Sequence, residues 1–269
     1  MNADQLARLA EEAAAAGASV AADRFRTDLD VERKAGDEAV TELDRAAQAA
    51  VVDRLRETVP DATIVGEETG TADAVPPDKT AWIVDPIDGT ENYVRGNRRW
   101  ATSVARLKDG EPVAAANRLP SLGDGYAGCP GLVTKNGQPV AVSERDDPRR
   151  FAVAPIVWWG FDRREEYTAA VQAILERFGD LRRTGSAQAT LSLVAAGGLD
   201  GAITNVAASP WDTVAGAAMV EWAGGRVTDL DGEPWRYDSY GLVASNGQAH
   251  DAVLAAAQEI DRAATGTPR

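Results

Sequence analysis

The chain has few of the residue types on which several common classes of enzyme site depend. Its 269 residues include one cysteine, Cys129, and one histidine, His250. A single cysteine excludes an internal disulfide and a metal site of clustered thiolates, and we expect Cys129 to be a small buried residue. The lone histidine lies far along the chain from the acidic segments, which argues against a Ser-His-Asp triad and a typical zinc hydrolase. Of the common catalytic sites, one that uses divalent metals held by oxygen ligands stays compatible with this composition.

Long apolar runs and lysines are also scarce. No segment approaches the roughly 20 apolar residues of a membrane-spanning helix, and the acidic, amphipathic residues 1–22 do not resemble a signal peptide. We therefore predict a cytoplasmic protein with no membrane partner. The chain has only four lysines, and its 42 acidic residues outnumber its 28 basic residues, for a formal charge of −14. Such a surface argues against a nucleic-acid partner, whose phosphate backbone is itself negative.

The acid-rich, lysine-poor composition also bears on the host. It is typical of proteins from a high-salt cytoplasm, where the Debye length falls to about 3 Å at 1 M salt and self-repulsion is screened. The alternative is an acidic enzyme from an ordinary mesophile. Full stability and activity in dilute buffer would favour that alternative.

The most informative segment is residues 82–90, with the sequence WIVDPIDGT. Its apolar start predicts a short buried strand, and Pro86 predicts that the chain turns at Asp85, because proline lacks the N–H that a central ladder needs. Asp88 follows three residues later, so both carboxylates can face one point, where the carbonyl of Ile87 can add a third oxygen. Hard oxygen ligands favour Mg²⁺ or Mn²⁺ over softer metals.

The end of this segment is suited to an anion. Gly89 lets the backbone approach a ligand closely, and Thr90 opens a helical turn whose free N–H groups can hold a phosphate. Asp-Pro and Asp-Gly are also ordinary turn formers, so the motif alone would more often be a plain loop. Acids recur at element ends elsewhere, however, in residues 64–68 (IVGEE) and 210–212 (PWD). The sequence therefore predicts a combined metal and phosphate site.

Three blocks of the chain together resemble the inositol monophosphatase family of Mg²⁺-dependent, lithium-sensitive phosphatases. The blocks are residues 66–68 (GEE), residues 85–93 (DPIDGTENY) and residues 211–212 (WD) with the later AGG at 223–225, in the family's order and approximate spacing. Weaker matches are Lys34 ahead of residues 40–44 and Gly185-Ser186 before an apolar helix. The resemblance covers most of the chain.

The resemblance implies a set of metal ligands. Glu67, Asp85 and the carbonyl of Ile87 match the ligands of a first ion, and Asp85 would bridge to a second ion that also takes Asp88 and Asp212. A third, weaker ion would lie near Glu67. The implied cofactor is thus two or three Mg²⁺ ions, with Mn²⁺ as a substitute.

The resemblance also implies how catalysis proceeds. The amides of Gly89 and Thr90 match phosphate contacts, and Thr90 and Asp44 match the pair that orients a metal-bound water. That water would attack the phosphorus, so no covalent intermediate is expected. Glu67 joins this catalytic group, as does Lys34, which lies in a loop that closes near the third metal; a solvated loop cation is the alternative for Lys34.

The substrate is the least defined part of the prediction. A Glu that contacts ring hydroxyls in family members acting on inositol phosphate is replaced here by Asn205, which can still donate and accept hydrogen bonds. Arg183 can meet a second phosphate or pair with a surface acid, and we favour the pairing. A glycosidase that uses Glu67 and Glu68 is excluded, because neighbours at a strand end point apart. The predicted substrate contacts are Asp88, Gly89, Thr90, Asn205 and Asp212.

We expect a phosphomonoesterase for a small-molecule polyol or sugar phosphate of the inositol-1-phosphate type. A fructose-1,6-bisphosphatase or a histidinol-phosphate phosphatase of the same family is the alternative. Outside enzymes, a catalytically weak regulatory binding protein with this fold is the competing reading, although a scaffold has no need for converging carboxylates. Because relatives are commonly dimers, we expect a homodimer.

The pattern of elements predicts an α/β protein, because short apolar runs alternate with helical periodicity. By resemblance the fold is the five-layered α-β-α-β-α sugar-phosphatase fold, with the site between its halves. Asp146-Asp147-Pro148 breaks the pattern, so we divide the chain into residues 1–145, with Glu67 and the motif at 85–90, and residues 146–269, with Asp212. Helices are expected near residues 4–25, 43–55, 165–178, 187–196, 213–223 and 251–263, and strands near residues 63–66, 81–84, 101–107, 113–117, 151–157, 181–183, 202–205 and 242–245. A hairpin is expected around the Asn136-Gly137 turn.

Overall fold

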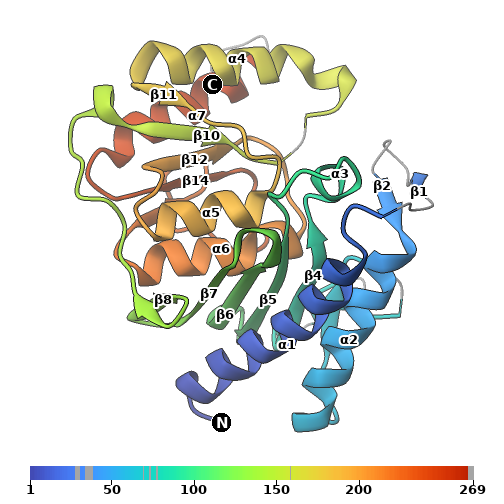
Figure 1. Ribbon diagram of the computed structural model, residues 1–269. Coiled ribbons are helices and arrows are strands. Elements are labelled where there is room, and N and C mark those ends of the chain that lie inside the picture. Colours follow the sequence, from blue (N-terminus) through green and yellow to red (C-terminus); the bar gives the residue numbers. More distant parts are fainter. Residues whose placement is uncertain are drawn as a thin grey trace.

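The protein consists of five alternating layers of helix and sheet (Figure 1). The computed structural model describes residues 1–27, 31–33, 39–68, 70–72, 74–76, 78–157 and 159–265. Helices α5 and α6 lie between the two large sheets, α1 and α2 cover the outer face of one sheet, and α4 and α7 cover the outer face of the other. The helices are α1 (Ala3–Arg24), α2 (Glu42–Thr58), α3 (Thr90–Val94), α4 (Arg164–Arg177), α5 (Ala187–Ala195), α6 (Pro210–Trp222) and α7 (His250–Thr265).

The first large sheet has seven strands in the order β3-β4-β5-β6-β7-β8-β9, and only the pair β3 and β4 is parallel. From β5 to β9 the sheet forms from consecutive hairpins, in which antiparallel neighbours are joined by short connections. A separate antiparallel pair, β1 (Val31–Arg33) and β2 (Ala39–Thr41), precedes α2. The strands of the large sheet are β3 (Ile64–Gly66), β4 (Ala81–Asp88), β5 (Ala101–Lys108), β6 (Glu111–Leu119), β7 (Asp124–Cys129), β8 (Leu132–Lys135) and β9 (Gln138–Pro139).

The second large sheet has five strands in the order β11-β10-β12-β14-β13. Strand β10 runs parallel to both β11 and β12, whereas β14 is antiparallel to its neighbours β12 and β13. Its strands come from residues 152–245, and those of the seven-stranded sheet from residues 64–139. The predicted division at residue 145 stays a prediction. The strands are β10 (Ala152–Pro155), β11 (Asp180–Leu181), β12 (Gly201–Thr204), β13 (Arg226–Thr228) and β14 (Leu242–Ser245).

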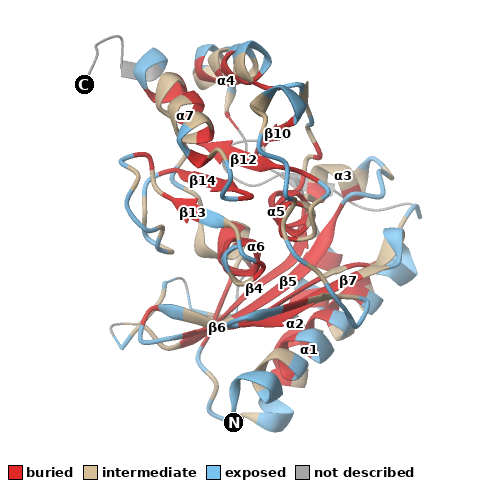
Figure 2. Cartoon of the chain, turned by 90° about the vertical axis from the view of Figure 1, so that its left-hand side faces the viewer, coloured by how far each residue is buried: buried red, intermediate tan, exposed pale blue. Residues whose placement is uncertain are grey.

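Strand β4 is buried on both faces, and the alternating directions of its side chains determine which layer Asp85 faces. Trp82 and Val84 pack with α1 and α2, whereas Ile83 packs in the layer that contains α5 and α6. Because side chains two residues apart on a strand share a face, Asp85 also points toward α5 and α6. Figure 2 shows that both sheets are buried and that exposed residues lie on the outer faces of the surrounding helices.

The five layers confirm the predicted fold class, and most elements agree with the expected positions. The prediction that Pro86 ends the strand at Asp85 is wrong, because β4 continues to Asp88. A break in register between Asp85 and Asp88 accommodates the proline, and Thr102 donates its hydroxyl to the Pro86 carbonyl at 2.8 Å. Such a bulge re-aims the side chains that follow it. Strands β1, β2, β7 and β13 were not predicted. No helix among the described residues is long and apolar enough to cross a membrane.

Candidate metal and phosphate site

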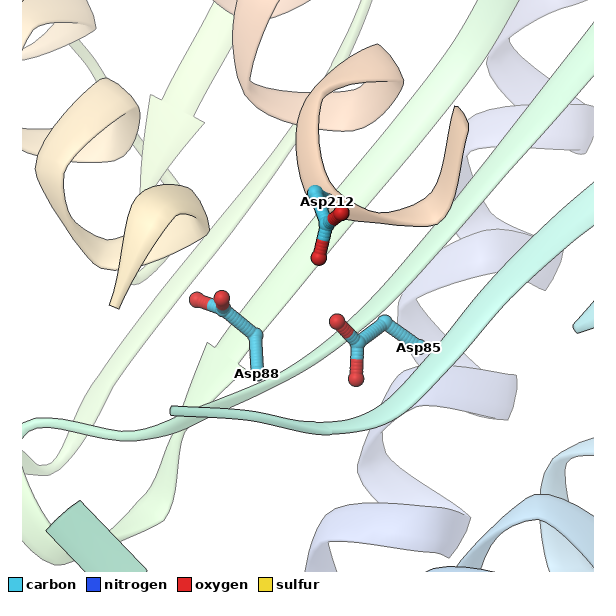
Figure 3. A group of neighbouring side chains, drawn as sticks. All are labelled: Asp85, Asp88 and Asp212. Atoms are coloured by element: carbon cyan, nitrogen blue, oxygen red, sulfur yellow. The ribbon is translucent and has the colours of Figure 1, made fainter. Parts of the chain in front are cut away.

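Three carboxylates from two distant parts of the chain converge between the sheets. Asp85 and Asp88 lie at the end of β4, and Asp212 lies in the first turn of α6. One oxygen from each of the three lies within 4.8 Å of the others, and Figure 3 shows the side chains facing a common point. Among the residues that the structure describes, this is the one group of three metal-ligating side chains.

Helix α6 begins in a way that fixes Asp212. Pro210 occupies the first turn, where its missing N–H costs no hydrogen bond, and Ser209 is the N-cap. The Asp212 carboxylate accepts a hydrogen bond from the Ser209 backbone N–H at 3.1 Å. One oxygen of Asp212 is thus held by the helix start.

Asp88 is held by the start of another helix, α5. Its carboxylate accepts hydrogen bonds from the Ser186 hydroxyl, from the Ala187 N–H at 3.1 Å and from the Gln188 N–H at 2.8 Å. Burial raises the pKa of Asp88 to about 6, and these hydrogen bonds oppose the rise. Sequence reasoning missed Ser186 and Gln188 as neighbours of the site, although a serine before an apolar helical run is a typical N-cap pattern.

Asp85 differs from its two neighbours because part of its carboxylate has no partner. Its Oδ1 atom is buried without a hydrogen bond to any described residue, and the side chain is only 2% exposed. Burial raises the pKa of Asp85 well above its usual value, and the charges of Glu67, Asp88, Asp212 and Asp44 raise it further. A buried, unpaired oxygen amid like charges is costly unless a cation is present.

The predicted phosphate cradle follows directly after β4. Gly89 has a φ of 88° and is the N-cap of α3, whose first residue is Thr90. A Cβ at Gly89 would lie 3.0 Å from the Gly185 carbonyl oxygen, so this position has both a backbone and a packing need for glycine. The Thr90 hydroxyl lies 2.9 Å from the carbonyl oxygen of Ile87 and 3.4 Å from Oδ1 of Asp44, which α2 contributes. The predicted pair Thr90 and Asp44 is therefore in contact.

Glu67 lies beside the three carboxylates but outside their cluster. Strand β3 pairs in parallel with β4, with Gly66 opposite Val84, so Glu67 follows next to Asp85. Its charge contributes to the raised pKa of Asp85, although its oxygens do not belong to the group within 4.8 Å. Gln48 fixes the adjacent turn, because its amide exchanges two hydrogen bonds with the backbone of Glu68.

The remaining predicted residues have separate surroundings. Lys34 lies outside the described residues. Asn205 is fully buried; its Oδ1 accepts from Trp159 Nε1 at 2.8 Å and its Nδ2 donates to Glu166. Its contact with substrate stays a prediction. Arg183 donates to the Val157 carbonyl at 3.4 Å and forms no ion pair with a described acid, so the pairing we favoured is not formed there.

The comparisons with known proteins agree with this geometry. Residues 2–262 match the model of the inositol monophosphatase family. The chain belongs to this family. It is 30% identical over 259 residues to the fructose-1,6-bisphosphatase/inositol-1-monophosphatase of Aquifex aeolicus, covering 93% of this chain and 94% of the relative. It is also 30% identical over 232 residues to the Nus factor SuhB of Escherichia coli, covering 84% and 85%.

The fold is similar to that of the Thermotoga maritima IMPase, with a TM-score of 0.84 at 30% identity and coverage of 96% of this chain and 97% of the other. Family membership supports a phosphatase and leaves its substrate open. The acidic triad is suited to a metal by its oxygen ligands and by the unpaired Oδ1 of Asp85.

Proposed function

We propose that the protein is a Mg²⁺-dependent phosphomonoesterase that hydrolyses a small polyol or sugar phosphate. The observation that carries the proposal is the unpaired Oδ1 of Asp85, buried among four other acids beside a glycine turn. A fold without a ligand gains nothing from this arrangement, because buried like charges oppose folding.

The acidic triad fits a divalent metal ion, and the proposed cofactor is the two or three Mg²⁺ ions that the resemblance implies, with Mn²⁺ as a substitute. Asp85, Asp88 and Asp212 would hold one ion; Asp85, Glu67 and the Ile87 carbonyl are the proposed ligands on the other side. Bound divalent cations neutralise phosphate oxygens, lower the pKa of water and stabilise a leaving alkoxide.

The chain's own residues supply orientation and proton transfer. The N–H groups of Gly89 and Thr90 would bind phosphate oxygens at the start of α3. The Thr90 hydroxyl, 3.4 Å from Asp44, would orient the attacking water, and the Asp44 carboxylate would receive its proton. No side chain need form a bond to phosphorus. The catalytic set is Asp44, Glu67, Thr90 and Lys34, and the proposed substrate contacts are Asp88, Gly89, Thr90, Asn205 and Asp212.

Two other functions compete with this proposal. A relative bears the name fructose-1,6-bisphosphatase/inositol-1-monophosphatase, which supports a bisphosphate substrate as one alternative. Histidinol phosphate, a monophosphate, is the other substrate alternative. Another relative bears the name Nus factor SuhB, which favours a regulatory binding role as the non-enzyme alternative. Against that role, the triad at Asp85, Asp88 and Asp212 is intact. A cytoplasmic location, a high-salt host and a homodimer also stay proposals.

A phosphate-release screen tests the proposal. The substrates are inositol-1-phosphate, fructose-1,6-bisphosphate, histidinol phosphate and adenosine 3′,5′-bisphosphate, each with Mg²⁺ or EDTA and at low and high salt. We expect Mg²⁺-dependent release from at least one ester and its loss in Asp212→Asn. Asp146→Asn, which alters an exposed acid outside the site, is the matched control. No release from any ester, or undiminished release by Asp212→Asn, would contradict the proposal.

A further inference from the structure

Gln188 occupies a position in which its side chain connects the two helices that hold the acidic site. We propose that Gln188 is a positioning residue, which fixes the start of α6, and with it Asp212, relative to the start of α5, and with it Asp88. This inference rests on the proposed function for its catalytic meaning, although the geometry it claims exists without metal or substrate.

The contacts of Gln188 reach both aspartates. Its backbone N–H donates to the Asp88 carboxylate at 2.8 Å. Its side-chain Nε2 donates to the carbonyl oxygen of Trp211, the residue immediately before Asp212, at 2.7 Å. Its Oε1 accepts from the Gly216 N–H, one turn further along α6, at 2.8 Å. Gln188 thus donates directly to the carboxylate of Asp88, and its side chain bonds the backbone before and after Asp212.

A third element, strand β6, joins the network. Asn117 on β6, which is 1% exposed, donates from Nδ2 to Oε1 of Gln188 at 3.0 Å and lies 2.9 Å from the Ser192 hydroxyl. The seven-stranded sheet, α5 and α6 are therefore joined through one buried amide. Because Gln188 is 0% exposed, every lost partner would leave a buried polar group without water to replace it.

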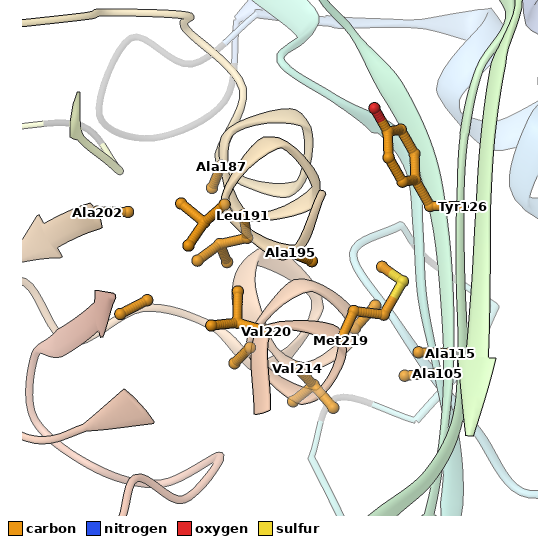
Figure 4. Packing of buried hydrophobic residues seen from close by; sticks show 14 of the residues in the cluster. Ala105, Ala115, Tyr126, Ala187, Leu191, Ala195, Ala202, Val214, Met219 and Val220 are labelled. Atoms are coloured by element: carbon orange, nitrogen blue, oxygen red, sulfur yellow. The ribbon is translucent and has the colours of Figure 1, made fainter. Parts of the chain in front are cut away.

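The close packing of α5 against α6 makes this connection possible. A Cβ at Gly216 would lie 2.4 Å from Cβ of Leu191 and 2.9 Å from Oε1 of Gln188, so glycine is required where the amide reaches the helix backbone. Figure 4 shows Leu191 on α5 and Val214 and Val220 on α6 within the apolar cluster of this layer. The apolar contacts bring the helices together, and the polar contacts of Gln188 set where the first turn of α6 lies.

Gln188→Met is the variant that tests the inference, because methionine nearly preserves the volume and removes all three side-chain hydrogen bonds. Gln258→Met is the matched control, since Gln258 donates to the Leu230 carbonyl at 2.8 Å on α7, outside the site. We measure Mn²⁺ affinity by calorimetry, phosphate release against metal concentration, and hydrogen exchange of residues 208–218 in metal-free protein.

The expected result is a split between metal affinity and maximal turnover. Loss of an outer partner of metal ligands typically weakens metal affinity 10- to 100-fold. For Gln188→Met we expect Mn²⁺ affinity to fall within that range. At saturating Mn²⁺ its rate of phosphate release should be within about threefold of the native rate. Hydrogen exchange in residues 208–218 should be at least about tenfold faster than in the native protein. Gln258→Met should change none of these. Combined with Asn117→Ala, the Gln188→Met effect should be less than additive, because the two residues share a network.

Unchanged exchange in residues 208–218 of metal-free Gln188→Met would overturn the inference, whether or not the protein binds metal. The inference would also be overturned if Gln188→Met bound Mn²⁺ as tightly as the native protein, or if Gln258→Met lost as much Mn²⁺ affinity as Gln188→Met. Failure of the proposed function has a different signature: the native protein would release no phosphate, while faster exchange in Gln188→Met would still support the positioning role.

Discussion

Two buried polar clusters in this protein differ in whether their hydrogen bonds are complete. Beside the C-terminal sheet, His250 at the start of α7 is 3% exposed, with Nε2 2.9 Å from the Thr228 hydroxyl of β13 and Nδ1 2.8 Å from the Ser245 hydroxyl of β14. At the end of β4, Asp85 is 2% exposed and its Oδ1 has no partner among the described residues. Both side chains are equally removed from water.

The difference separates a structural role from a ligand site. Burial lowers the pKa of His250 to about 4, so the ring is neutral near pH 7 and two hydroxyls satisfy it. Burial and four nearby acids instead raise the pKa of Asp85, and nothing in the described chain compensates its charge. A cluster with all its hydrogen bonds stabilises the fold by itself, whereas an unpaired oxygen among several acids favours a bound cation.

The largest expected effect is on activity, in Asp85→Asn. Loss of the charge that bridges the proposed ions should reduce phosphate release on the order of 10³-fold. The same change removes repulsion among the acids, so the melting temperature of the metal-free protein should rise. Steady-state kinetics and thermal unfolding in EDTA measure the two effects. A variant that keeps activity, or that unfolds earlier without metal, would break the distinction between the clusters.

The next effect is a pH dependence of stability that arises from His250. Its pKa falls from 6.5 to about 4 on folding, so the unfolded chain binds the proton more readily and stability is lost as pH falls through this range. The shift corresponds to about 3 kcal/mol of the unfolding free energy. Urea unfolding of native protein and His250→Gln between pH 7 and 4 should show a smaller loss in the variant; parallel curves would contradict the assignment.

Metal should stabilise the acidic cluster by a similar amount. Mg²⁺ at about 100 times its dissociation constant should add about 2.7 kcal/mol to the unfolding free energy, which corresponds to a rise in melting temperature of roughly 5 to 10 °C. The rise should disappear in Asp85→Asn and persist in His250→Gln. A melting temperature of the native protein that is unmoved by millimolar Mg²⁺ would count against the site.

The smallest effect compares the loss of one hydroxyl hydrogen bond in each cluster, from Ser186 to Asp88 and between Thr228 and His250. Ser186→Ala removes one of three hydrogen bonds to Asp88, so metal affinity should fall about tenfold. Thr228→Ala removes one of two hydrogen bonds to His250, so it should cost about 1 kcal/mol of stability and leave metal affinity unchanged. Calorimetric titration with Mn²⁺ and urea unfolding of both variants provide the comparison. Identical profiles for the two would mean that the clusters do not differ in kind.

Much of the fold follows from the sequence because periodicity and caps are local. Strand β14 (Leu242–Ser245) has the expected ends, and α5 begins at the expected residue, Ala187. The convergence of Asp85, Asp88 and Asp212 was anticipated from their positions at element ends together with family resemblance. Periodicity alone would not have joined residues more than a hundred positions apart.

The parts that sequence reasoning missed depend on tertiary contacts. Pro86 does not end β4, because a break in register with β5 accommodates it, and no local rule reveals a bulge. The polar role of Gln188 was hidden within an apolar helical run, since its partners Trp211 and Gly216 come from a different helix. Asn205 was predicted from resemblance as a substrate contact, but its amide partners, Trp159 and Glu166, depend on packing of the C-terminal sheet.

The most direct test of the account is a crystal structure of the protein soaked in Mn²⁺, with anomalous diffraction to locate the ion. We predict an anomalous peak between the carboxylates of Asp85, Asp88 and Asp212, with an oxygen of each within about 2.0 to 2.3 Å of it. Carboxylates that stay apart, or a peak elsewhere with none between these three side chains, would contradict the central claim that the incomplete cluster is a metal site.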